Sequence, residues 1–168
     1  KDLREAVESA RRAREGWADA SSYLRGQILY RMAEMLESRR EEFASALSTT
    51  SPLTPAKARR EVDASIDRVV RFAGWADKVQ QVLGCQNPVA GPYYNFSVPQ
   101  PSGLVGILAP DAPSLLSLVT MIAAPLSVGC PVVGVASETS PLPAVLLGEV
   151  CATSDVPGGV VNLLTGKR

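Results

Sequence analysis

The residues most suggestive of chemistry lie in a short turn, Ala109–Pro113, within the stretch "PSGLVGILAPDAPSLLSL". An apolar run of β-strand type, Leu104–Leu108, precedes the turn, and an apolar helical run, Leu115–Val128, follows it. A strand, a turn and a helix in this order begin a dinucleotide-binding unit, whose ligand lies at the carboxyl ends of the strands. This turn, however, offers little that grips a phosphate. The sequence therefore predicts either a cofactor site or the retained shape of one.

Few of the side chains that catalysis most often uses are present. The sequence contains no histidine, which removes the usual general base near neutral pH and the commonest metal ligand. Serine–histidine and cysteine–histidine catalysis are thereby excluded within these 168 residues. Cys85, Cys130 and Cys151 are far apart and odd in number, so neither a disulfide framework nor a metal site is predicted. We expect all three cysteines to be small buried side chains.

Charge is unevenly distributed along the chain. The formal net charge of +0 argues against a nucleic-acid-binding protein. No lysine or arginine lies between Lys78 and Lys167, so a phosphate bound in this half must rely on backbone N–H groups and a helix N-terminus alone. A surface so poor in charge is expected to be covered by another part of a protein.

Three amphipathic patterns in the first half predict helices whose apolar stripes form core. Their apolar residues recur at spacings of three, four and seven. The predicted helices are Leu3–Ala18, a second from Ser21 or Ser22 as cap to Leu47, and a third from Thr54 and Pro55 to Val79. No apolar run approaches the roughly 20 residues of a membrane helix, and the first residues lack signal-peptide character, so we expect a cytoplasmic protein with no membrane contact.

The second half predicts a different architecture, because strand-like and helix-like runs alternate. A connector begins after Gly84, and short apolar strands with intervening apolar helices are typical of a parallel sheet with helices on its faces. Three such strands leave an open edge, so we expect the chain to be part of a larger fold or to pair with a partner. The predicted strands are Tyr93–Val98, Leu104–Leu108, Pro131–Ala136 and Gly159–Leu164, and the helices are Leu115–Val128 and Pro141–Ala152.

Several segments, in order and spread over essentially the whole chain, resemble the aldehyde dehydrogenase superfamily. They are a tryptophan, arginine and "MAEMLESRREEFA" pattern in Trp17–Ala44, "EVDASIDRVVRFAGWADK" in Glu61–Lys78, "PSGLVGILAP" in Pro101–Pro110, "SETSPL" in Ser137–Leu142 and "PGGVVNLLTG" in Pro157–Gly166. The resemblance implies an α/β fold in which N-terminal helices precede the first half of a Rossmann-like parallel sheet, that is, a partial domain. It divides the chain into a helical segment at residues 1–84, a connector with an oligomerisation-arm strand at residues 85–103, and half a cofactor domain at residues 104–168.

The sequence departs from the family pattern at the residues that carry its chemistry. Where the family has Pro-Trp-Asn, with an asparagine that stabilises the oxyanion, this chain has Pro110, Asp111 and Ala112. Loss of one such donor typically costs about 100- to 1000-fold in rate. Where the family has Lys-Pro-Ser-Glu, this chain has Val135 in place of the ribose-binding lysine, which should weaken dinucleotide binding roughly 10- to 100-fold.

The resemblance places no catalytic residue in this chain. The family's nucleophilic cysteine and general-base glutamate come later in its sequence, and none of the three cysteines here matches them. Asp111 and Val135 make the chain most like the second, degenerate and non-catalytic domain of family 16 aldehyde dehydrogenases. We therefore expect a pseudo-enzyme domain with a structural and associating role, with NAD(P) not bound tightly. The vestigial cofactor residues would be Ala109, Pro110, Val135, Ser137 and Glu138.

Two other functions are consistent with the same residues. The chain could be part of an active NAD(P)-dependent aldehyde dehydrogenase, with Ala109, Pro110, Ser137 and Glu138 lining the adenosine groove. Alternatively, the inherited crevice could take a different nucleotide or an acyl ligand. The expected partner is protein: the remainder of a larger fold, a tandem domain or another copy, contacted through Tyr93, Tyr94 and Phe96. The alternative for these three is an ordinary half-buried strand.

Overall fold

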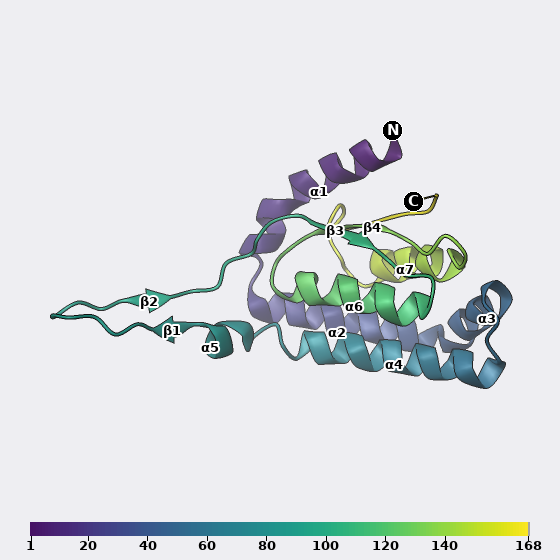
Figure 1. The fold of residues 1–168 in the computed structure, drawn as a ribbon, viewed down its shortest axis with the longest axis horizontal. Coiled ribbons are helices and arrows are strands. Elements are labelled where there is room, and N and C mark those ends of the chain that lie inside the picture. The colour runs from purple at the N-terminus through teal and green to yellow at the C-terminus, as the bar shows by residue number, and fades with distance from the viewer. Residues whose placement is uncertain (168) are drawn as a thin grey trace.

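The computed structural model describes residues 1–167, which form a body of helices and a small sheet from which a long arm projects (Figure 1). The helices are α1 (Asp2–Asp19), α2 (Ser22–Ser38), α3 (Arg40–Thr50), α4 (Pro55–Ala73), α5 (Val79–Leu83), α6 (Ser114–Ser127) and α7 (Leu142–Thr153). The strands are β1 (Cys85–Gln86), β2 (Phe96–Ser97), β3 (Val105–Leu108), β4 (Val132–Val135) and β5 (Val161–Leu164). The predicted α/β class, with helices first and a partial sheet after them, is confirmed.

The predicted helix caps form, but two predicted helix boundaries are wrong. Ser21 Oγ accepts a hydrogen bond from the Leu24 N–H at 3.1 Å, and Thr54 Oγ1 accepts one from the Lys57 N–H at 3.4 Å. The helix expected to run to Leu47 breaks at Arg39, where the backbone has φ −106° and ψ 18°. A polar run there interrupts the apolar stripe, and the bend lets α3 pack against both α4 and α7.

The third predicted helix also ends early. The α4 helix stops at Ala73 with Gly74 as its cap, whereas the apolar pattern predicted a helix to Val79. Ala76 remains buried although it lies in the following turn, and Val79 begins the separate short helix α5. The apolar residues therefore keep a spacing of three or four through the turn between α4 and α5. Periodicity alone cannot distinguish such a turn from a continuing helix.

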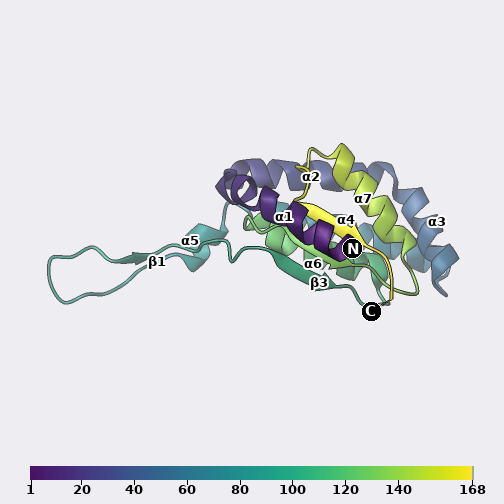
Figure 2. The same cartoon turned by 90° about the horizontal axis from the view of Figure 1, so that it is seen from above.

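The sheet of β3, β4 and β5 is parallel, in that order, with α6 and α7 as the crossover helices. Val132 of β4 points into the main core, while its neighbour Val133 packs with Ala6 and Ala10 of α1 on the other face. Figure 2 shows α1 passing over this second face. Because β4 is central and buried on both sides, it reads as a continuous apolar run, as predicted. The edges of the sheet are β3 and β5.

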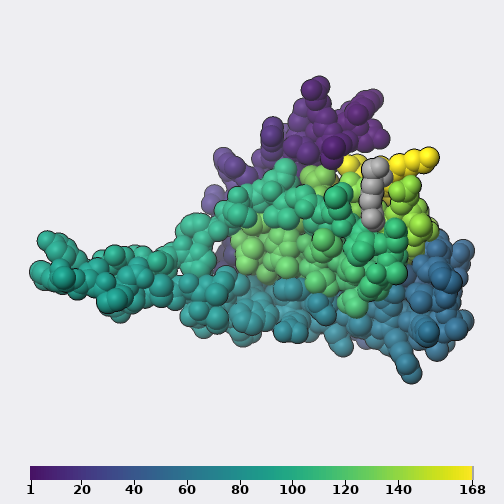
Figure 3. All heavy atoms as spheres, in the orientation of Figure 1, coloured from purple at the N-terminus to yellow at the C-terminus, as the bar shows by residue number. Residues whose placement is uncertain are grey.

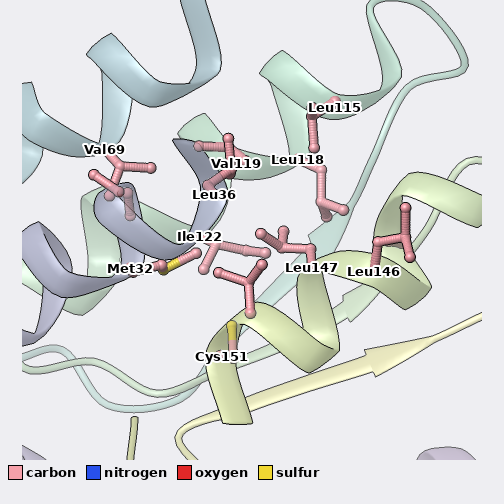
Figure 4. Close-up of a cluster of buried hydrophobic side chains, with 14 of the residues drawn as sticks. Met32, Leu36, Val69, Leu115, Leu118, Val119, Ile122, Leu146, Leu147 and Cys151 are labelled. Carbon is pink, nitrogen blue, oxygen red and sulfur yellow. The ribbon is translucent and has the colours of Figure 1, made fainter. Parts of the chain in front are cut away.

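One core joins the N-terminal helices to the sheet segment. Figure 4 shows Met32 and Leu36 of α2 meeting Ile122 of α6 and Leu147 of α7. Cys151 lies in the same core, and burial raises the pKa of its thiol to about 12. The predicted apolar stripes therefore become buried contacts between elements more than 100 residues apart in sequence, as between α2 and α7.

The arm is an antiparallel pair of very short strands that extends away from the body (Figures 1 and 3). Only Phe96–Ser97 of the predicted strand Tyr93–Val98 is a strand, and its partner β1 lies in the segment predicted to be a connector. Cys85 is exposed, so the expectation that all three cysteines are buried is wrong for this one; Cys130 and Cys151 are buried. The reason is that Cys85 lies on the arm, where the described residues form no core around it.

One buried arginine, Arg25 of α2, forms hydrogen bonds to the ends of α1 and α6. The Arg25 side chain is only 7% exposed, and it donates to the Ser127 carbonyl at 3.2 Å, to the Ala18 carbonyl at 3.3 Å, to the Ala20 carbonyl and to Ser22 Oγ. Burial lowers the pKa of this guanidinium from its ordinary value. The carbonyls lie at the C-terminal ends of α1 and α6, which is where the helix dipole favours a cation.

We expect Arg25→Met to lower the free energy of unfolding by about 2–4 kcal/mol, because buried carbonyls would lose their donors. Arg31→Met on the same helix is the control, since Arg31 forms an exposed ion pair with Asp155 and its loss should cost less than about 1 kcal/mol. Urea unfolding of the full-length protein measures both variants. Equal effects of the two substitutions would contradict this role of Arg25.

Candidate functional site

The carboxyl ends of β3 and β4 lie side by side and bring the predicted cofactor residues to one edge. The Ala109 N–H donates to the Val135 carbonyl at 2.9 Å, which joins the two turns that follow these strands. Ala109 and Ser137 are buried, Val135 is half-buried, and Pro110 and Glu138 are exposed. All five residues therefore lie in the two turns or at the strand ends that lead into them.

Asp111 links the two turns directly. Its Oδ1 atom accepts a hydrogen bond from Ser137 Oγ at 2.8 Å and another from the Glu138 N–H at 3.1 Å. Ser137 Oγ in turn accepts from the Ser140 N–H at 2.9 Å. A single carboxylate oxygen thus orders the turn that leads from β4 into α7. From the sequence, Asp111 was expected only to be a departure from the family pattern, without these hydrogen bonds.

Hydroxyl groups extend this link into the body. Ser140 Oγ lies 2.6 Å from Thr50 Oγ1 of α3 and accepts from Ser114 Oγ, at the start of α6, at 3.3 Å. Thr50 Oγ1 also donates to the Ala46 carbonyl at 2.8 Å. The turn after β4 is therefore fixed to both helices by buried or half-buried hydroxyls. No sequence pattern pairs these residues, because they are separated by 26 to 90 positions.

A second carboxylate occupies the N-terminus of α6. Glu61 Oε1 of α4 accepts from the Leu115 N–H at 2.9 Å and from the Leu116 N–H at 3.3 Å. Pro113, the residue at the cap position, supplies no side-chain hydrogen bond. Glu61 therefore does from another helix what a local cap residue usually does. No sequence pattern indicates this role, because Glu61 precedes Leu115 by 54 positions.

One arginine from outside the sheet segment comes near this edge. Arg68 of α4 donates from Nη1 to Thr120 Oγ1 at 3.4 Å. Together with Pro110 and Pro113 it lines a hollow of about 370 Å³ along the side of α6. No lysine or arginine lies between Lys78 and Lys167 in the sequence. In the folded chain, however, Arg68 lies beside the site, where it lines the same hollow as Pro110 and Pro113.

No thiol of residues 1–167 lies at the carboxyl ends of β3, β4 and β5. Cys130 precedes β4 and therefore sits at its opposite, amino end, and Cys151 lies inside the core on α7. Over the same residues, no cluster of histidine, cysteine, aspartate and glutamate side chains is arranged to hold a metal ion. The edge consequently offers carboxylates, hydroxyls and main-chain N–H groups as its polar chemistry.

The predicted contact residues of the arm are strongly exposed. Tyr93, Tyr94 and Phe96 are 75%, 73% and 58% exposed, and the rings of the last two lie with centroids 5.5 Å apart. The alternative of an ordinary half-buried strand is therefore wrong for these residues. Their aromatic surface is available for contact with another polypeptide.

Comparison with known proteins extends over the whole sequence. A cytosolic 10-formyltetrahydrofolate dehydrogenase of Xenopus tropicalis is 35% identical over 98% of this chain and 19% of its own length. Omega-crystallin of Enteroctopus dofleini is 31% identical over 98% of this chain and 33% of its own length. The structure of an aldehyde dehydrogenase from Bacillus cereus in complex with NAD+ superimposes with a TM-score of 0.93 and 28% identity, over 99% of this chain and 34% of that one.

The chain thus spans between 19% and 34% of the length of these relatives. Within residues 1–167, no helix is both long enough and apolar enough to span a membrane. The family model for aldehyde dehydrogenases matches residues 1–168. This chain therefore belongs to the aldehyde dehydrogenase family.

Proposed function

We propose that this chain is part of a pseudo-enzyme domain, in which the aldehyde dehydrogenase scaffold is kept for association and stability and NAD(P) is not bound tightly. Within the family, the proposed relationship is to the second, non-catalytic domain of family 16. We place the protein in the cytoplasm. Its three segments, at residues 1–84, 85–103 and 104–168, would serve as helical support, contact arm and retained half of the cofactor domain.

The observation that carries this proposal is that main-chain N–H groups at the carboxyl edge already bind carboxylates of the chain. A phosphate in this half was expected to depend on backbone N–H groups and a helix N-terminus. Glu61 already takes the N–H groups of Leu115 and Leu116, and Asp111 takes that of Glu138. An anionic ligand at these three N–H groups would have to displace carboxylates of the chain itself. Val135 and Ala112 supply no side-chain hydrogen bond that would offset this cost.

The arm supports the associating part of the proposal. Three exposed aromatic side chains on a projecting hairpin form an apolar surface that water does not favour. The sheet also ends at β3 and β5, whose outer backbone groups can pair with further strands. Protein partners, namely the remainder of the fold, a tandem domain or another copy, would cover these surfaces.

The second candidate is part of an active NAD(P)-dependent aldehyde dehydrogenase. Its support is the close superposition on a relative whose structure was determined with NAD+, and the intact placement of Ala109, Pro110, Ser137 and Glu138 at one edge. In this case the adenosine would lie against Glu138, and the nucleophile would come from outside these residues.

Isothermal titration of the full-length protein with NAD+ and NADP+ separates the two candidates. We expect a Kd weaker than about 1 mM, because the ribose-binding lysine is replaced and the edge donors are occupied. The double variant Ala112→Asn with Val135→Lys should bind about 10-fold more tightly than the unaltered protein. Sub-millimolar binding by the unaltered protein would contradict the pseudo-enzyme proposal.

The arm is tested by placing charge in its aromatic surface. We expect Tyr94→Asp with Phe96→Asp to shift the sedimentation coefficient of the full-length protein toward a smaller species, because a buried contact would have to desolvate two carboxylates. Tyr23→Asp is the matched control, since Tyr23 is 71% exposed on the body and should leave sedimentation unchanged. If the arm variant sediments like the unaltered protein, the arm is not the contact.

A further inference from the structure

We propose that Asp111 is an internal ligand of the inherited crevice: it takes the place of a bound cofactor in ordering the turn after β4, and it competes with any external anion for that turn. This inference rests on the proposed function, because it explains how the crevice keeps its shape with no dinucleotide. Asp111 is a positioning residue here, since it acts through Ser137 and Glu138.

A single atom, Asp111 Oδ1, accepts two hydrogen bonds that join the two turns. Asp111 Oδ1 receives the Ser137 hydroxyl at 2.8 Å and the Glu138 N–H at 3.1 Å, and both donors lie on the neighbouring turn. Hydrogen bonds to an ionised acceptor are roughly twice as strong as those between neutral groups. The backbone N–H of Glu138 therefore has a strong partner without any ligand.

The order created by Asp111 passes on toward α7. Ser137 donates its only hydroxyl proton to Asp111, so its lone pairs remain free to accept the Ser140 N–H, which they do at 2.9 Å. Ser137 is buried, so its hydroxyl has little access to water that could replace Asp111. Losing the carboxylate would leave Ser137 free to rotate and would weaken both main-chain bonds of the turn.

The start of α6 shows the same arrangement independently. Glu61 Oε1 holds two N–H groups there, so the two main-chain donor sets at this edge are both held by carboxylates from elsewhere in the chain. A phosphate or ribose hydroxyl that approached the turn after β4 would have to expel Asp111. We expect this competition to reduce the affinity for an anionic ligand by about 10-fold or more.

Hydrogen exchange followed by mass spectrometry on the full-length protein tests the positioning role. In Asp111→Ala, the amides of Glu138 and Ser140 should exchange about 10-fold faster or more, because their hydrogen bonds are lost or weakened. Asp111→Asn keeps a carbonyl oxygen that can accept both bonds, so its exchange should be intermediate; it also serves if the alanine variant does not fold. Glu138→Gln is the matched control, which removes an acid from the same turn and should leave the Ser140 amide unchanged. Exchange at residues 137–140 that is the same in all four proteins would overturn the proposal.

Titration of the same proteins with NAD+ and with inorganic pyrophosphate tests the competition. We expect Asp111→Ala to bind these probes about 10-fold more tightly than the unaltered protein. Glu149→Gln, which removes an exposed acid of α7 outside the two turns, is the control and should show no such gain. Equal gains in both variants would show a general charge effect and would overturn the competition. Tight NAD+ binding by the unaltered protein would instead contradict the proposed function, while slow exchange that depends on Asp111 would still support its positioning role.

Discussion

The hydrogen bonds that Ser137 and the Glu138 backbone donate to the Asp111 carboxylate join the two turns at the carboxyl edge, and the proposed function of this edge depends on them. In a nucleotide-binding sheet the turns at the carboxyl ends of the strands present N–H groups that a ligand satisfies. Here the chain satisfies them itself, with Asp111 at one turn and Glu61 at the start of α6. Ser137 and Leu115 are buried, so their donor groups need partners whether or not a cofactor is bound, and under the proposed function these carboxylates supply them.

In the body of the molecule, too, a charged side chain finds its hydrogen-bond partners within the chain. Arg25 is buried without a carboxylate among its hydrogen-bond partners in residues 1–167, and main-chain carbonyls of two helix ends receive its charge. The arm differs, because its aromatic side chains are exposed and the described residues supply no core for them. The molecule therefore combines a buried core with one exposed aromatic projection, as the proposed associating role requires.

Most of the fold could be predicted from local pattern, and most of the site could not. Pro131–Ala136 was recognisable because a buried parallel strand is a continuous apolar run between turn residues. Leu104–Leu108 was recognisable by the same apolar composition, although β3 is an edge strand and only Ile107 is fully buried in it. The break at Arg39 and the end of α4 at Ala73 were not predicted, because apolar residues resume at helical spacing after both points, at Phe43 beyond the polar run around Arg39 and at Ala76 beyond Ala73. The strand β1 was missed because two exposed residues without a core carry no periodic signal. The hydrogen-bond partners of Asp111 could not be predicted, for a different reason. Asp111 and Ser137 are 26 positions apart and meet only because the parallel sheet places their turns side by side, so no local sequence pattern indicates the contact.

The most direct test of the account is a crystal structure of the full-length protein soaked with NAD+. The account predicts no ordered adenosine at the carboxyl edge, with Ser137 still donating to Asp111 and the Glu138 N–H still bound to the same oxygen. Well-ordered adenosine seated against Glu138, with Asp111 displaced from the turn, would contradict it.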